Sequence, residues 1–406
     1  MSAPKLLVVA SATDLDFRYG CTPAWWQLWK GLYQAGCDLI VTPYRGRPVE
    51  SPWWRVEANP CYRQGEIFAA ARGALARVRK DAHQRLEDNP PDTTADRLVR
   101  EVIWRRVTPR WRRHLAKIVE REHPDAVIVF TVPMSHFRGI PTFLRDRFSI
   151  PVVYYDGDVP LSLPEYGGAD TGFNIYYGAD PSEYDLVLSN SEGGCARLVE
   201  LGARRAEPIF WGADPELFSP LGIEKDKDIF FYGYGDKFRR EWMRELVGEP
   251  SRRLDGVDFV LGGRDFRGDV GRARRIGDVP FNAFNHAIAA SRINLNITRR
   301  SHATVTASST SRLFELAAAG AAIVSNPVAG IERWFEPGRE LAVAADADEA
   351  VGTYRELLDD PALGEEMGRR ACERVLDEHT YTHRARELLV RIGQLTPPRT
   401  PVTAGG

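Results

Sequence analysis

Short apolar runs alternate with helical stretches along this chain, and that alternation restricts its fold more than any other feature. Strand-like runs lie at residues 6–10, 39–42, 126–130, 152–155 and 186–189, and again at 228–232, 259–261, 293–297 and 322–325. Helical stretches, such as residues 25–35 and 195–201, lie between and after them. Such alternation is typical of parallel strands joined by crossover helices. We therefore predict an α/β fold.

The length of the chain indicates two domains. Its 406 residues exceed what a single hydrophobic core usually serves. Residues 211–220 contain one glycine and two prolines and are interpreted as a linker. We place the first domain at residues 1–219, with a polar helical insertion at about 60–122, and the second at 220–395. The tail, residues 396–406, is rich in Pro, Thr and Gly and is predicted to be disordered.

Composition excludes several classes of protein. The net charge of −2 gives no reason to expect nucleic acid or an anionic membrane as a partner. The five cysteines are scattered without a C-x-x-C pair, which favours a reducing compartment over a disulfide scaffold or a zinc site. The first apolar run, Leu6–Ala10, is too short for a signal peptide or a transmembrane helix. We expect a soluble, cytoplasmic protein.

A basic segment at residues 97–121 carries eight Lys or Arg side chains after Arg97, together with Trp104 and Trp111. A basic helix with aromatic residues can lie on a membrane surface or bind an acidic partner. The alternative is a solvated face whose tryptophans pack inward, and most charge runs are of this kind. We favour the solvated face and keep peripheral membrane contact as the alternative.

Residues 308–326 predict a polar loop, a short helix, a glycine stop and a buried strand. Ser309, Thr310 and Ser311 are helix-capping types, and Gly320 suits the left-handed turn after a helix. The first N–H groups of a helix have no internal partner and bind phosphate readily. Glu315, one turn further on, could accept hydrogen bonds from ribose hydroxyls. Taken alone, the stretch fits an ordinary capped helix before a core strand better than a binding site.

A second glycine-containing turn follows the strand at 228–232. Gly233 and Gly235 would let the backbone approach a pyrophosphate, and Lys237, Arg239 or Arg240 could neutralise its charge. The turn is neither a complete G-x-G-x-x-G, since position 238 is Phe, nor a Walker A loop. A plain strand–helix turn is the alternative interpretation.

Several short words in the second half together resemble the donor-binding half of the GT-B glycosyltransferases, and most closely the CgeB-like, spore-maturation-type branch. They are Leu295-Asn296-Ile297-Thr298-Arg299, Ser311-Arg312-Leu313-Phe314-Glu315, Gly320, Phe335-Glu336-Pro337-Gly338-Arg339-Glu340, Glu378-His379-Thr380-Tyr381 and His383-Arg384-Ala385. The resemblance covers residues 210–395 well and the first half only loosely.

The resemblance implies two Rossmann-like domains with parallel sheets that face a central cleft. A nucleotide sugar, which is a substrate rather than a cofactor, would bind the second domain without a metal. Arg299 and Arg312 would stabilise the departing diphosphate, the largest catalytic effect available without a metal. The implied donor-binding residues are Gly233, Tyr234, Gly235, Lys237, Thr298, Thr310, Ser311, Leu313 and Glu315.

Asp156 and Asp158 form a D-x-D triplet after a strand. In GT-A glycosyltransferases such a pair holds a divalent metal, but this chain has three other D-x-D triplets, and a GT-B enzyme would need none. One of the two carboxylates could take a proton from an acceptor hydroxyl. A turn carboxylate that caps nearby N–H groups explains the pair equally well.

Acceptor-side candidates follow two strands of the first domain, because α/β proteins bind ligands at the carboxyl ends of parallel strands. These candidates are Asp14, Asp16, Arg18, Gly20 and His136. A lone histidine is more often structural, so His136 is the weakest of the set.

One departure from related enzymes leaves the chemistry open. Retaining GT-B enzymes often carry two glutamates eight positions apart, but here Ala307 stands eight positions before Glu315. A non-catalytic GT-B-like protein that binds a sugar or nucleotide is therefore an alternative, and a sugar-nucleotide epimerase is a third. The donor base, the sugar, the acceptor, the anomeric outcome and the oligomeric state are not determined by the sequence.

Overall fold

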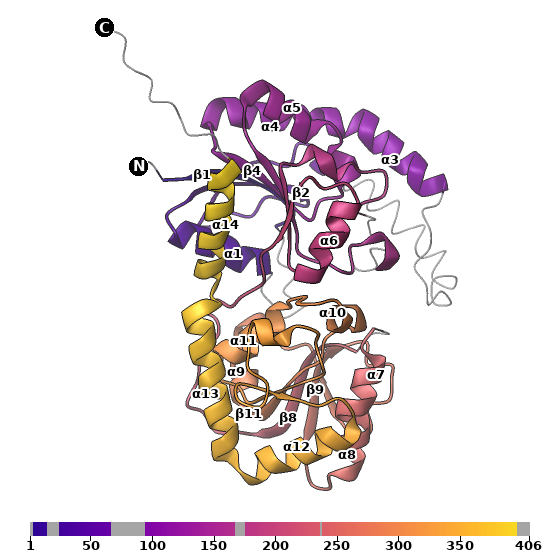
Figure 1. Ribbon diagram of the computed structural model, residues 1–406, viewed down its shortest axis with the longest axis vertical. Coiled ribbons are helices and arrows are strands. Elements are labelled where there is room, and N and C mark those ends of the chain that lie inside the picture. The colour runs from indigo at the N-terminus through magenta and orange to yellow at the C-terminus, as the bar shows by residue number, and fades with distance from the viewer. Residues whose placement is uncertain (1–2, 14–23, 66–93, 167–174, 236–237, 396–406) are drawn as a thin grey trace.

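The chain forms two parallel β-sheets, each covered by helices, in a computed structural model that describes residues 3–13, 24–65, 94–166, 175–235 and 238–395 (Figure 1). The first sheet has the order β3-β2-β1-β4-β5-β6-β7 and the second the order β10-β9-β8-β11-β12-β13. Every strand pair in both sheets is parallel. Both orders reverse direction at the first strand, as in doubly wound nucleotide-binding folds.

The strands coincide with the apolar runs of the sequence. The first sheet contains β1 (Lys5–Ala12), β2 (Asp38–Arg45), β3 (Arg55–Val56), β4 (Ala126–Phe130), β5 (Val152–Asp156), β6 (Leu186–Ser189) and β7 (Ala206–Pro208). The second contains β8 (Lys227–Tyr234), β9 (Phe259–Arg264), β10 (Arg274–Gly277), β11 (Ser291–Asn296), β12 (Ile323–Ser325) and β13 (Ala342–Val343). Strands β4, β5, β6 and β12 are buried along their whole length because helices cover both faces of each sheet. The predicted α/β fold with parallel sheets is confirmed.

The helices follow the strands in turn. Those of the first domain are α1 (Ala24–Gln34), α3 (Thr94–Arg106), α4 (Thr108–Glu122), α5 (Ile140–Phe148) and α6 (Glu192–Glu200). The second domain has α7 (Arg240–Met243), a π-helical turn at Arg244–Gly248, α8 (Glu249–Arg253), α9 (Phe281–Ala289), α10 (Arg300–Thr304), α11 (Ser311–Ala318), α12 (Ala347–Asp359) and α13 (Pro361–Glu378). The last helix is α14 (Tyr381–Leu395).

The basic segment is two helices, α3 and α4, rather than one. The break at Val107 precedes Pro109, which has no amide N–H and therefore suits the first turn of a new helix. Trp111 is fully buried, whereas Trp104 is 41 % exposed and lies under the guanidinium of Arg138. The expected inward packing therefore holds for Trp111, and membrane contact by this segment stays a prediction.

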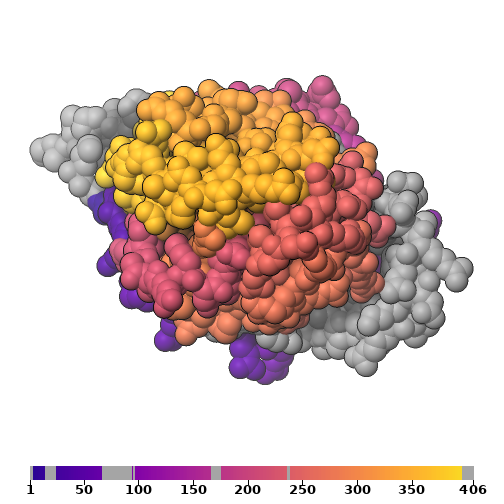
Figure 2. Space-filling model, turned by 90° about the horizontal axis from the view of Figure 1, so that it is seen from below, coloured from indigo at the N-terminus to yellow at the C-terminus, as the bar shows by residue number. Residues whose placement is uncertain are grey.

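The last helix returns to the first domain. Figure 1 shows α14 beside α1, while α13 runs along the second domain. The contact is close: a Cβ added at Gly31 of α1 would lie 2.5 Å from the carbonyl oxygen of Tyr381. In Figure 2, where the molecule of Figure 1 is seen from below, segments of the second domain make up most of the coloured face. The C-terminal domain as drawn from the sequence, 220–395, thus ends with a helix that packs on the other unit.

The expected linker is a buried, bonded segment. Asp214 pairs with Lys30 of α1, the Nζ and Oδ2 atoms being 2.6 Å apart, and both side chains are about 6 % exposed. Trp211 packs against Tyr155 and Tyr381, whose ring centroids lie 5.3 Å and 6.5 Å away. None of the helices in the described ranges has the length and apolarity that a membrane crossing requires.

Candidate functional site

A cavity of about 330 Å³ lies where the two domains meet. Gly157 and Asp158, which follow β5, and Trp211 line it from the first domain and the crossing segment. The second domain contributes Phe231, Tyr232, Gly233, Tyr234, Arg239, Gly263, Arg264, Asp278, Asn296, Ile297, Thr298, Arg299, His302, Ser309, Thr310, Ser311 and Arg312. Most of these residues stand at or just after the carboxyl ends of β8, β9 and β11, where parallel sheets bind ligands.

The start of helix α11 forms one wall of the cavity. Its N-cap residue, Thr310, is extended (φ −125°, ψ 140°), but its side chain makes no capping hydrogen bond. The hydroxyl of the neighbouring Ser309 instead donates to the carbonyl of Asn190 at 2.8 Å and accepts from the amide of Trp211 at 2.9 Å. The expectation of a side-chain cap is therefore wrong, because Ser309 bonds across the domains. The first turn of α11 is left without a side-chain cap at the cavity wall.

Three arginines make this wall positive. Arg239 is held by two carbonyl oxygens, since its Nε donates to Ile297 at 2.8 Å and its Nη1 to Tyr234 at 3.2 Å. The guanidinium of Arg312 lies 4.1 Å from the ring centroid of Phe284. Arg299 is half-buried at the end of the loop after β11. A fourth arginine, Arg264, is neutralised by Asp278, both of whose oxygens lie 2.8 Å from its Nε.

Glu315 does not face the cavity. The residue is 1 % exposed, and its Oε2 lies 3.0 Å from Nη1 of Arg312. Burial raises the pKa of this carboxyl, and the charge of Arg312 and hydrogen bonds from Gln27 and Ser311 oppose that rise. The expected contact with ribose does not form in this arrangement, because the carboxylate turns back against Arg312. Leu313, another expected donor-binding residue, is also buried and lies outside the cavity lining.

The two aspartates of the D-x-D triplet have different surroundings. Asp156 is fully buried, where its Oδ2 accepts from the hydroxyl of Tyr176 at 2.5 Å and its Oδ1 from the amide of Asp158 at 3.0 Å. Burial raises the pKa of Asp156. Asp158 is half-buried and lines the cavity. Asp156 therefore matches the interpretation as a turn carboxylate, and Asp158 alone is placed to meet a ligand.

The two glycines of the turn after β8, Gly233 and Gly235, also differ in whether they line the cavity. Gly233 lines the cavity beside Gly263, which has φ +108° and whose added Cβ would lie 2.0 Å from the carbonyl oxygen of Gly233. Gly235 is buried under Phe266 and lies outside the lining. Lys237 falls outside the described residues. Only the first glycine of the turn is therefore placed against the cavity.

The acceptor-side candidates are not brought together by the described structure. Asp14, Asp16, Arg18 and Gly20 lie outside the described residues. His136 is 4 % exposed, its Nδ1 lies 2.7 Å from the hydroxyl of Tyr44, and burial lowers its pKa to about 3. The cleft role considered for His136 is wrong for this arrangement, because the ring packs inside the first domain.

Sequence reasoning missed several lining residues. Trp211, Asn296 and His302 carry no motif of their own, although Asn296 stands within a word that supported the resemblance. Burial, followed by the charges of Arg299 and Arg239, lowers the pKa of His302 to about 3, so this ring is neutral at pH 7. Polar residues just after strand ends were the only signal that could have found them.

Comparison with known proteins fits this geometry. A family model described as glycosyl transferase-like matches residues 239–390. No curated protein sequence matches the chain. Among solved structures, sucrose-phosphate synthase from Thermosynechococcus elongatus aligns with a TM-score of 0.63 at 14 % identity, over 96 % of this chain and 99 % of that one.

Two further structures carry donor ligands. Anabaena HepE in complex with UDP-glucose aligns with a TM-score of 0.57 at 12 % identity, covering 96 % of this chain and 99 % of HepE. An E. coli structure described as trehalose-6-phosphate and bound with UDP-2-fluoro glucose aligns with a TM-score of 0.59 at 12 % identity, over 96 % and 99 %. At such identities the likeness establishes the fold, which is the two-domain GT-B arrangement expected from the sequence.

Proposed function

We propose that this GT-B chain, whose residues 239–390 are glycosyl transferase-like, transfers a sugar from a nucleoside diphosphate sugar to an acceptor without a metal ion. The observation that carries the proposal is the wall formed by Arg239, Arg299 and Arg312 around the uncapped start of α11. Arginine and free N–H groups are the groups that bind phosphate oxygens. Within the family we assign the chain to the CgeB-like branch, on the words at 295–299 and 311–315.

The wall supplies a place for the charge that develops during transfer. When the bond between the anomeric carbon and the diphosphate oxygen breaks, the electron pair leaves with the diphosphate. The guanidinium groups of Arg299 and Arg312 and the N–H groups of α11 stabilise that charge. Glu315, which pairs with Arg312, acts by orienting this guanidinium. In this scheme it is a positioning residue rather than a ribose ligand.

Asp158 completes the scheme from the first domain. It lines, from the first domain, the same cavity as the positive wall. Its carboxylate would take the proton from the acceptor hydroxyl as the oxygen attacks the anomeric carbon. Because Asp156 is buried and bonded, we assign the base to Asp158 alone.

The test is release of nucleoside diphosphate from a panel of nucleotide sugars in EDTA, with UDP-glucose first because HepE was solved with it. We expect release with at least one donor, and a rate lowered about 10- to 100-fold in Arg312→Gln. Arg355→Gln, an exposed arginine on α12 outside the cavity, should leave the rate unchanged.

Three results would contradict the proposal in different ways. Binding without release would identify a non-catalytic binding protein. Conversion of the nucleotide sugar without release would identify an epimerase. Release that is lost in EDTA and restored by Mn²⁺ would overturn the metal-independent scheme.

A further inference from the structure

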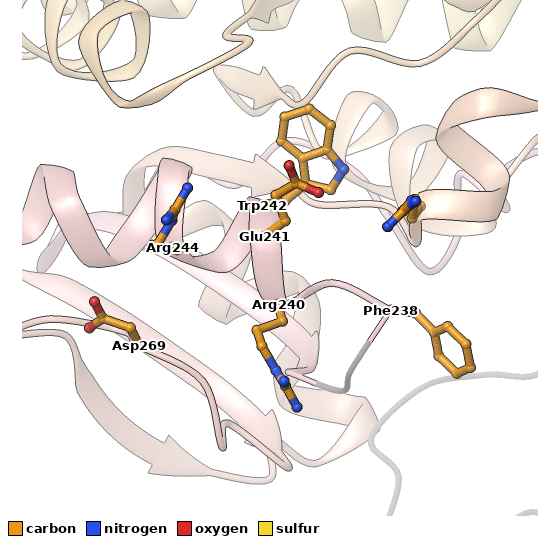
Figure 3. Close-up of a pocket in the computed structure, with 7 residues that line it drawn as sticks. Phe238, Arg240, Glu241, Trp242, Arg244 and Asp269 are labelled. Carbon is orange, nitrogen blue, oxygen red and sulfur yellow. The ribbon is translucent and has the colours of Figure 1, made fainter. Parts of the chain in front are cut away.

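A second cavity of about 430 Å³ opens on the second domain beside the first one. Phe238, Arg240, Glu241, Trp242, Arg244, Asp269 and Arg300 line it. In the view of Figure 3, Arg244 and Asp269 lie at one end and Phe238 at the other, with Glu241, Trp242 and Arg240 between them. The proposed transfer uses none of these residues, and Arg240, considered above for neutralising a pyrophosphate, lines this cavity rather than the first.

The two cavities share a wall. Arg239 and Arg299 face the first cavity, and the next residues in the chain, Arg240 and Arg300, face the second. The amide of Arg300 donates to the carbonyl of Phe238 at 2.9 Å, which ties the two segments together. A ligand in the second cavity would therefore lie beside the ligand in the first.

The charges of the second cavity are only partly neutralised. Arg244 pairs with Glu245, and Asp269 pairs with Arg252, a residue outside the lining. Within the ranges that the structure describes, Arg240 and Arg300 have no carboxylate partner and Glu241 has no cationic one. Two guanidinium groups and one carboxylate are thus available to a ligand.

Trp242 adds an apolar surface. The residue is half-buried, with part of its indole packed on the core of the second domain. Arg240, Glu241 and Arg300 are exposed. The cavity therefore offers two cations, a hydrogen-bond acceptor and an aromatic ring.

We propose that this cavity binds a phosphorylated or carboxylated sugar, which serves as the acceptor. Guanidinium groups bind phosphate and carboxylate through paired N–H donors, so Arg240 and Arg300 would hold the anionic group. Glu241 would accept from the sugar hydroxyls, and Trp242 would cover the apolar face of the ring. The inference rests on the proposed transfer, for which it names the class of acceptor.

Direct binding tests the cavity separately from the reaction. Titration calorimetry of the full chain with glucose 6-phosphate, in saturating UDP, should show binding that weakens about 10- to 100-fold in the double variant Arg240→Gln/Arg300→Gln. Arg355→Gln should bind as the wild type does. Trp242→Ala should weaken binding of glucose 6-phosphate but leave binding of inorganic phosphate unchanged, and melting temperatures would show that each variant is folded.

Kinetics tests the acceptor role. With UDP-glucose as donor, glucose 6-phosphate or glucuronate should stimulate UDP release more than uncharged glucose does. The double variant should raise the KM of the charged sugar at least tenfold and leave the KM of UDP-glucose within about twofold. Equal stimulation by glucose, or an equal rise in both KM values, would overturn the acceptor assignment.

The two proposals fail separately. If no nucleotide sugar releases its diphosphate, the proposed transfer is wrong, whereas calorimetry still decides whether the cavity binds an anionic sugar. If glucose 6-phosphate does not bind, if the double variant binds it as tightly as wild type, or if inorganic phosphate binds equally tightly, the second site is wrong while the donor site stands.

Discussion

At the scale of single residues, the pair formed by Arg312 and Glu315 connects the cavity wall to the core. Arg312 faces the cavity and lies over the rings of Phe284 and Tyr232, with its guanidinium 4.1 Å and 5.2 Å from their centroids. Glu315 holds it from behind, where the carboxylate is almost fully buried. The guanidinium of Arg312 thus lines the cavity on one side and pairs with a buried carboxylate on the other.

Replacement of Glu315 by glutamine should change how stability depends on pH. Burial raises the folded-state pKa of this carboxyl above the ordinary 4.5, so its contribution to stability is full below that value and is lost as the pH rises through the folded-state pKa. The melting temperature of Glu315→Gln relative to wild type should therefore increase as the pH rises from about 4.5. A difference that is constant over this range would show that the carboxyl titrates normally.

At the scale of elements, helix α11 begins at the cavity without the cap that most helices have. The eight residues Ser311–Ala318 end at Ala319, and Gly320 follows with φ +69°, as its position in the sequence predicts. Leu313, Phe314, Ala317 and Ala318 are buried in a hydrophobic core. The residues at its C-terminus therefore specify where α11 ends, whereas no side chain caps its start.

A carboxylate placed at that start should separate stability from binding. Thr310→Asp would cap the helix and stabilise it by about 0.5–2 kcal/mol. The same charge would repel a diphosphate, so the affinity for UDP should fall about tenfold or more. Thr310→Asn is the matched control, since it caps comparably without the charge and should bind UDP more tightly than Thr310→Asp.

Thermal melts and UDP titrations of both variants would check this prediction. If UDP binds Thr310→Asp as tightly as wild type, the start of α11 does not hold phosphate. Loss of stability in both variants would instead show that the N-cap position is already satisfied.

At the scale of the whole molecule, buried hydrogen bonds join the two domains. Ser309 bonds to Asn190 and Trp211, and the hydroxyls of Ser191 and Ser308 lie 2.7 Å apart. Ala307 lies within this contact with φ +48°, and its carbonyl accepts a hydrogen bond from the backbone amide of Glu192. The loop before α11 therefore fixes both the domain contact and the direction of the helix.

Ser309→Ala should weaken the contact between the domains. The change leaves the amide of Trp211 without this acceptor, a loss worth about 1–3 kcal/mol for a buried group. We expect a lower melting temperature together with a larger radius of gyration in X-ray scattering.

Ser251→Ala is the matched control for this effect. Ser251 is buried, donates to the carbonyl of Gly248 at 2.9 Å and accepts from the amide of Arg272 at 2.9 Å, all within the second domain. Ser251→Ala should therefore lower the melting temperature to a similar extent without changing the radius of gyration. An unchanged radius in Ser309→Ala would show that this serine does not hold the domains together.

Local signals in the sequence specify the elements and the fold class. Apolar runs and turn residues are local signals, and the strands at 126–130, 152–155 and 186–189, like the helix before Gly320, form where those signals place them. Some cavity residues could also be named in advance. Gly233 follows from its place in a turn after a strand, whereas Thr298, Arg299 and Arg312 came from the words that resemble GT-B enzymes.

Only the tertiary structure decided which polar groups meet. Glu315 stands one turn into α11 as predicted, yet its carboxylate is turned back against Arg312 and away from the cavity. Asp156 and Asp158 are two positions apart in the chain, but one is buried on Tyr176 and the other lines the cavity. Serine is a common helix-capping residue, but the hydroxyl of Ser309 bonds to the other domain instead. Tyr176 lies 20 residues from Asp156 along the chain, and Asn190 lies 119 residues from Ser309, so local spacing does not encode these contacts. Glu315 has its partner only three positions away, and its burial keeps the carboxylate from the cavity.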